Sequence, residues 1–175
     1  MKRMIALLLV LTVALGMAAC GGKTGGDQTT VENLQGTMEE LIAKVNEKHA
    51  AVELPLMSMT LDLTDVDGLT YNTGLTSADK ITDAAISEPM MGQPYSLVLV
   101  RVAEGQDAAA VAQEMYDKID GRKWVCMEAD TRVAASHGDV AMFFMVSSEF
   151  AEQVTTATML EAFKAICSGE VKVID

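Results

Sequence analysis

Three residues close to one turn, Ser136, His137 and Asp139, are of the types that form a hydrolytic triad. In a working triad the acid orients the base and the base faces the nucleophile, so the three groups are brought together across a fold. Near-neighbours in a tight hairpin rarely reach that geometry, and the sequence contains no G-x-S-x-G nucleophile elbow. The spacing therefore favours turn chemistry over catalysis at this position.

Two further segments resemble known binding motifs but do not have the residue spacing that those motifs require. The run GGKT at 21–24 ends like a phosphate-binding loop, but the first glycine of that motif would fall on Met17. Asp65 and Gly68 resemble part of a calcium loop, yet the last position of the loop, which needs an acid, is Gly74. We therefore expect neither a nucleotide site nor an EF-hand, and we interpret the acids around position 65 as helix caps.

Metal binding has little support in the sequence. His49 and His137 are the only histidines, and neither lies near a cysteine or a second histidine, as zinc ligands usually do. The 13 methionines raise the question of copper(I), a soft ion that thioethers bind. However, Met57 and Met59 alternate with polar residues in MSMTLDLT, which favours core packing in a half-buried strand. We therefore predict no metal and no cofactor.

The N-terminus has the order of a bacterial lipoprotein signal. A lysine and an arginine at 2–3 precede an uncharged apolar run at 4–15, and small residues then lead into Cys20. The tract MAAC at 17–20 resembles a lipobox, in which a diacylglyceryl group is added to the cysteine and cleavage occurs just before it. We predict that Cys20 is lipidated and becomes the mature N-terminus. An ordinary cleaved signal and an uncleaved anchor remain as alternatives.

Charge restricts the partners. The formal net charge is −12, and removal of Lys2 and Arg3 with the signal would change it to −14. So acidic a chain does not bind nucleic acid or anionic lipid through charge. We therefore expect attachment to the outer face of the cell membrane through the lipid on Cys20, with a protein or a cell-envelope component as a possible partner and no nucleic acid.

The rest of the chain divides simply. After the signal at 1–19, residues 20–35 include a Gly- and Thr-rich linker, and residues 36–175 have the size of one domain. Apolar periodicity predicts helices near 37–51, 107–121 and 148–166, the last of them broken or continuous. Strand patterns occur at 57–64, 81–88, 95–103 and in a hairpin that turns at Gly138. We predict an α+β fold with two layers: a largely antiparallel sheet of about 4–5 strands and helices packed on one face.

This pattern resembles a known family. The runs MSMTLDLT, GLTSADKITDAAISEPMMG, YSLVLVRV and HGDVAMFFMV, together with the segment around Trp124, are similar to the "domain of unknown function 4358" of Gram-positive lipoproteins. The resemblance spans 57–165 and consists of packing and turn patterns. It implies a lipoprotein export signal and a small α+β domain, and it implies no reaction.

Two groups of residues deserve a structural test. After lipidation, Cys126 and Cys167 are the only thiols left, and an extracytoplasmic compartment permits a disulfide between them; two inert buried thiols are the alternative.

A basic–aromatic cluster is formed by Arg122, Lys123 and Trp124. We interpret the cations as complementing a helix C-terminus and the tryptophan as a core anchor, with a partner contact as the alternative.

The segment EPMMGQPY is the best candidate for a functional surface. It joins two predicted strands, and its two prolines stiffen the loop, which limits the entropy lost on docking. Met90 and Met91 are adjacent, so in an extended chain at least one is exposed for adaptable contacts. Glu88 and Tyr95 border the loop, and a stiff connector that buries both methionines is the alternative.

The function that fits these observations best is a membrane-anchored binding or structural module without catalysis. One alternative is a hydrolase-like enzyme with scattered residues, among them Glu88, Asp79 or His137. The other is a small-ligand receptor, although the domain is small for a two-lobed one.

Overall fold

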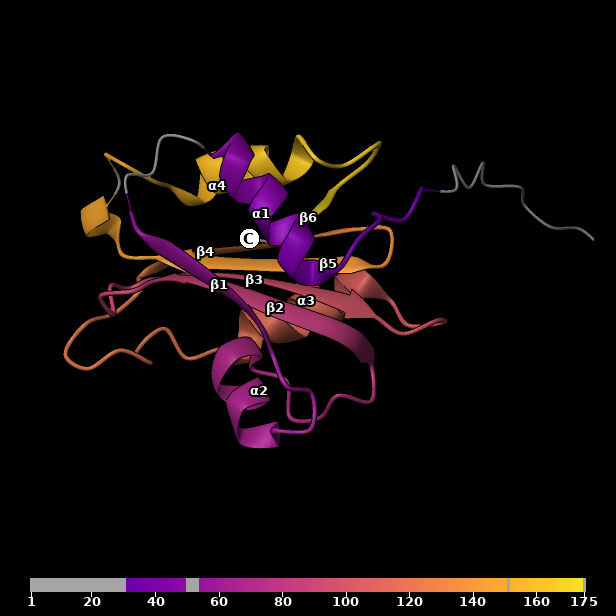
Figure 1. Cartoon of the computed structure of the whole chain (residues 1–175), viewed down its shortest axis with the longest axis horizontal. Helices are drawn as coiled ribbons and strands as arrows, with labels where there is room; N and C mark the ends of the chain where they lie inside the picture. Colours follow the sequence, from indigo (N-terminus) through magenta and orange to yellow (C-terminus); the bar gives the residue numbers. More distant parts are fainter. Residues whose placement is uncertain (1–30, 50–53, 151, 175) are drawn as a thin grey trace, which may run out of the picture.

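The computed structural model describes residues 31–49, 54–150 and 152–174. In this part of the chain six strands form one antiparallel sheet in the order β1-β2-β3-β5-β4-β6 (Figure 1). The strands are β1 (Leu56–Thr60), β2 (Ile81–Pro89), β3 (Tyr95–Val102), β4 (Thr131–His137), β5 (Val140–Val146) and β6 (Lys172–Ile174). The helices are α1 (Met38–Lys48), α2 (Val66–Thr73), α3 (Ala108–Lys118), the 3-10 turn η1 (Ser148–Phe150) and α4 (Thr156–Lys164). The α+β class with an antiparallel sheet is confirmed, and the sheet has six strands instead of four or five.

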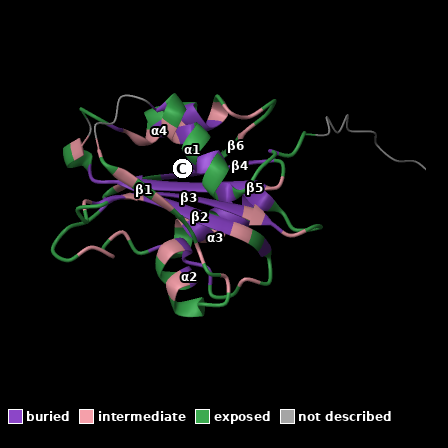
Figure 2. Cartoon of the chain, in the orientation of Figure 1, coloured by how far each residue is buried: buried purple, intermediate pink, exposed green. Residues whose placement is uncertain are grey.

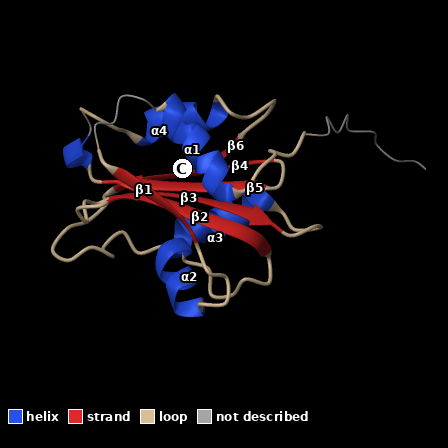
Figure 3. Ribbon diagram, in the orientation of Figure 1, coloured by secondary structure: helices blue, strands red, loops and turns tan. Residues whose placement is uncertain are grey.

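The helices cover both faces of the sheet, so the prediction of two layers with helices on one face is wrong. Helices α1 and α4 lie on one side and α2 and α3 on the other (Figures 1 and 3). Alternate residues of β3 follow this division: Leu97 and Leu99 pack with α1 and α4, whereas Val98 and Val100 pack with α2 and α3. A central strand whose consecutive residues are all apolar must be buried on both faces, as β5 is along its whole length and β3 is from Leu97 to Val100 (Figure 2).

The edge strand β1 differs most from its prediction. Its alternation predicts a strand correctly, but Met57 and Met59 are 48% and 45% exposed, so they are not core residues. The helix α3 packs on β3, β4, β5 and β6, toward the other end of the sheet from β1. The apolar side of β1 is therefore left partly open.

Local capping explains where the helices begin. Thr37 and Glu40 form the expected capping box of α1, and Asp65 and Asp107 cap α2 and α3. The predicted helix over 148–166 is broken into η1 and α4, because a second capping box around Thr155 restarts it. Leu34 is also buried in the core, two residues before the domain boundary expected from composition.

Candidate functional site

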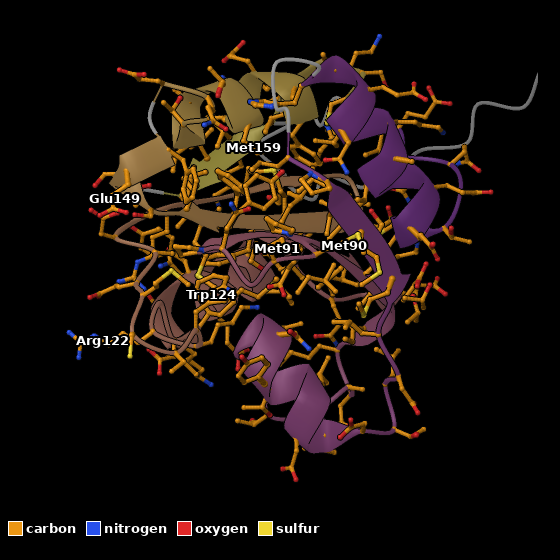
Figure 4. All side chains as sticks on the ribbon, turned by 60° about the vertical axis from the view of Figure 1, so that its left-hand side comes forward. Met90, Met91, Arg122, Trp124, Glu149 and Met159 are labelled. Atoms are coloured by element: carbon orange, nitrogen blue, oxygen red, sulfur yellow. The ribbon has the colours of Figure 1, made fainter. Side chains whose placement is uncertain are left out.

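The loop between β2 and β3 exposes the two methionines that the sequence singles out. Met90 is 69% and Met91 is 79% exposed. The backbone N–H of Met90 donates to Pro55 O at 3.2 Å, so the pairing with β1 continues past the end of β2 (Figure 4, where Met90 lies beside β1). Gly92 turns the chain with a φ of +62°, which favours glycine. The loop is therefore held to the start of β1 by a backbone hydrogen bond, and it carries two apolar side chains on the protein surface.

The other two residues of this candidate surface are placed differently. Tyr95 is fully buried and meets Phe144 edge to face, with ring centroids 5.0 Å apart at 76°. Its ring belongs to the core and cannot contact a partner. Successive side chains of β2 point to opposite faces of the sheet, so Glu88 lies on the other face from Ser87. There it faces a buried cation.

That cation is Lys123, whose side chain is only 1% exposed. Its ammonium lies 2.5 Å from a carboxylate oxygen of Glu88, whose side chain is 29% exposed. The same Nζ donates to Ser96 Oγ at 3.3 Å and to Asn72 Oδ1 at 3.4 Å. Three N–H bonds thus face three oxygen acceptors. The interpretation of Lys123 as a cation at a helix end is therefore wrong.

Two aromatic rings complete the enclosure. The Lys123 ammonium lies 5.3 Å from the ring centroid of Tyr71 and 5.2 Å from that of Trp124, within the range of cation–π attraction. The Tyr71 hydroxyl also donates to the Lys123 backbone oxygen at 2.7 Å. Burial lowers the pKa of Lys123, and the charge of Glu88 partly opposes this shift. We call these six residues the lysine cluster: Lys123, Glu88, Ser96, Asn72, Tyr71 and Trp124.

The lysine cluster contains a serine beside a lysine, a pair that can act as nucleophile and base. Here the geometry opposes that use. Ser96 is fully buried, so its hydroxyl is not open to solvent. The carboxylate of Glu88 beside the ammonium also opposes the loss of its proton. The contacts of the lysine cluster instead hold the segment between α3 and β4 against the end of β2.

The hairpin residues do not form a triad. His137 Nδ1 lies 2.9 Å from the backbone oxygen of Glu170, and Asp139 forms an ion pair with Arg101 at 2.5 Å. Arg101 also donates to the backbone oxygens of Leu34 and Gly36. These contacts attach the segment before α1 to the β4–β5 turn. The expectation of turn chemistry at this position agrees with the structure.

The predicted disulfide between Cys126 and Cys167 is not formed. Both thiols are free, with Cys126 exposed and Cys167 half-buried. Helices α3 and α4, which the two cysteines follow in the chain, lie on opposite faces of the sheet, so the fold does not bring the thiols together. Cys167 packs at the end of α4, where its Sγ donates to Phe163 O at 3.2 Å.

Sequence reasoning missed one groove. Between α1 and α4 a groove of about 500 Å³ is lined by Lys48, His49, Gln153, Ala157, Thr158, Glu161, Ala162 and Ala165. His49 is 7% exposed, its Nε2 lies 2.9 Å from Thr158 Oγ1, and burial lowers the pKa of its imidazole. A lone histidine at a helix end carries no sequence signal for such a groove. Around it and elsewhere in the described residues, no cluster of three or more His, Cys, Asp or Glu side chains is placed to hold a metal.

The remaining predicted site, Cys20, lies outside the described residues, as do the proposed signal and most of the linker. Among the helices of the described part, none has the length and apolar character needed to span a bilayer. Comparison of the chain with protein-family models, with curated proteins and with solved structures gave no match.

Proposed function

We propose that this chain is a membrane-anchored extracytoplasmic lipoprotein whose domain is a binding module without catalysis. The N-terminal order of charge, apolar run and MAAC supports a tether through the lipid on Cys20. Two acyl chains anchor a protein stably, whereas one binds only marginally. The resemblance to the lipoprotein family supports the same route of export.

The observation that carries the binding role is the exposure of Met90 and Met91 on a stiff loop. Prolines flank the pair, and the lysine cluster holds the end of β2 from inside. A flexible thioether adapts to different apolar surfaces, while a restrained backbone loses little entropy on docking. In contrast, Ser96 and Lys123 are enclosed, and the hairpin residues His137 and Asp139 are used in structural contacts. With a net charge of −14 after loss of the signal, the module suits a partner with an apolar contact and a neutral or basic rim.

A photo-cross-linking amino acid at position 91, in the lipidated protein in its own membrane, tests this role. We expect one discrete adduct, which disappears when Met90→Asp is added. The matched control places the same cross-linker at Val173, an exposed residue of β6 at the opposite edge of the sheet. A diffuse smear from both positions, or no adduct from position 91, would contradict a docking role for the loop.

The groove between α1 and α4 favours a second candidate, a small-ligand receptor. His49 Nδ1 is buried there without a hydrogen-bond partner among the described residues. A ligand that stabilises the protein against heat, and loses that effect in His49→Leu, would support this candidate over the binding module.

A further inference from the structure

The outer edge of β1 has unpaired backbone. Strand β1 pairs with β2 and, among the described residues, with no other strand. The bonds Met90 N→Pro55 O and Leu61 N→Ala84 O extend the same register at either end. In an antiparallel ladder every second residue bonds to the same neighbour. Met57 and Met59 therefore bond to β2, and the N–H and C=O groups of Ser58 and Thr60 point outward.

The strand itself carries no charge, and the charged group recorded beside it is Glu39, whose carboxylate accepts from Thr60 Oγ1 at 2.9 Å. Proteins usually blunt an open edge strand with lysine, proline or a bulge, since it can otherwise pair with another chain. The residues Leu56–Thr60 are uncharged, and the two methionines on one side of the strand are about half exposed, at 48% and 45%. An uncharged strand with exposed apolar side chains is suited to pairing with another strand.

We propose that β1 pairs with β1 of a second copy of this chain, antiparallel and about a two-fold axis at Ser58. The sequence Met-Ser-Met is the same in both directions, so each Met57 would lie opposite the second copy's Met59. The two Ser58 residues would exchange both backbone hydrogen bonds. The methionine pairs would then be the non-hydrogen-bonded ones, whose Cα atoms approach to about 4.5 Å. The result is one continuous sheet with four methionines packed together.

The symmetry of the strand favours a second copy as the occupant. Two mature chains of net charge −14 repel one another over most of their surfaces, so an uncharged strand is the place where contact between them costs least. The palindrome supplies the complementarity that a two-fold interface requires. The inference does not depend on the lipid anchor or on the loop of Met90 and Met91, although a shared membrane would raise the effective concentration of the two copies.

Sedimentation velocity over a range of concentrations tests the pairing, using the chain from residue 20 with Cys20→Ser. We expect a reversible dimer whose Kd rises about 100-fold or more in Met57→Lys with Met59→Lys, because like charges would face each other across the axis. Val173→Lys, on the opposite edge strand, is the matched control and should leave the Kd unchanged. A monomer at every concentration, or a dimer insensitive to the two lysines, would overturn the proposal.

Two further experiments distinguish loss of strand pairing from misfolding and from pairing with a different partner. Mixing the double-lysine chain with Met57→Glu and Met59→Glu should restore a dimer, since each lysine would lie opposite a glutamate. Ser58→Cys, with the native cysteines replaced by serine, should form a symmetric disulfide under mild oxidation, because paired Cα atoms lie about 5.5 Å apart. Failure of both, in folded protein, would show that another strand or no strand occupies this edge.

Discussion

The ammonium of Lys123 lies 2.5 Å from the carboxylate of Glu88, although the two residues are far apart in sequence. This contact joins the segment that follows α3 to the end of β2, directly before the loop of Met90 and Met91. Figure 4 shows the neighbouring Trp124 and Arg122 on this segment: Trp124 lies over the body of the domain and Arg122 extends outward. The ion pair therefore helps to set the shape of the surface to which we assign binding.

The first prediction is an asymmetry between the two partners of this ion pair. Glu88→Ala leaves a buried ammonium without its counter-charge, and we expect a loss of about 3 kcal/mol of unfolding free energy. Lys123→Met removes the buried cation and leaves a carboxylate that water can reach, so we expect a change within about 1 kcal/mol. Urea unfolding at neutral pH measures both.

Equal losses in the two variants would contradict the enclosed-cation account. The matched control is Lys80→Met, which removes an exposed ion pair with Glu114 and should change stability by less than about 1 kcal/mol.

The second prediction concerns Tyr95. Its hydroxyl is buried without a hydrogen-bond partner among the described residues, and burial raises its pKa. Tyr95→Phe keeps the packing on Phe144 and removes an unsatisfied polar group, so we expect a gain of about 1 kcal/mol at pH 7. Thermal unfolding is the measurement, and a clear loss of stability would show that the hydroxyl has a partner.

The third prediction is a loss of stability at alkaline pH through Cys167. Burial raises the pKa of this thiol to about 12 from its ordinary value of 9.0. Above pH 9 the unfolded chain loses the thiol proton while the folded chain keeps it, so stability falls as the pH rises from about 9 toward 12. Cys167→Ala should reduce the slope of unfolding free energy between pH 9 and 10, where Tyr95 contributes less because its ordinary pKa is 10.0.

The control is Cys126→Ala, at an exposed position, which should leave that slope unchanged. A slope that Cys167→Ala does not alter would assign the alkaline loss to other groups.

The fourth prediction separates binding from folding at the loop. Met90→Asp with Met91→Asp should shift the Tm by no more than a degree or two, because both side chains are mostly in water. Met142→Asp, in a fully buried position of β5, should instead abolish folding. Circular dichroism distinguishes these results, and unfolding of the double variant would mean that the loop is structural.

The sequence predicted those features that depend on neighbouring residues. The capping box at Thr37 and the turn at Gly138 follow from short spacings, and both occur in the structure. The exposure of Met57 and Met59 could not be predicted, because alternation marks an apolar side of a strand but not whether a helix covers it. The apolar run at 97–100 has no polar side, which indicates burial on both faces and therefore helices on both sides of the sheet.

Local sequence patterns could not predict the lysine cluster either. Glu88, Ser96 and Lys123 come from three separate elements, and only the fold brings them together. A lysine beside an aromatic residue is common on surfaces, so the sequence around Lys123 gave no reason to expect burial. The short strand β6 likewise has too few residues for a recognisable pattern.

The central claim is that a lipid on Cys20 tethers the domain to the outer face of the membrane. Intact mass spectrometry of the native protein, extracted from its membrane in mild detergent, tests it most directly. We predict a mature chain that begins at Cys20 and carries the mass of a diacylglyceryl group, and in Cys20→Ala an unprocessed precursor or a released domain. An unmodified Cys20, or a mature N-terminus at any other residue, would contradict the account.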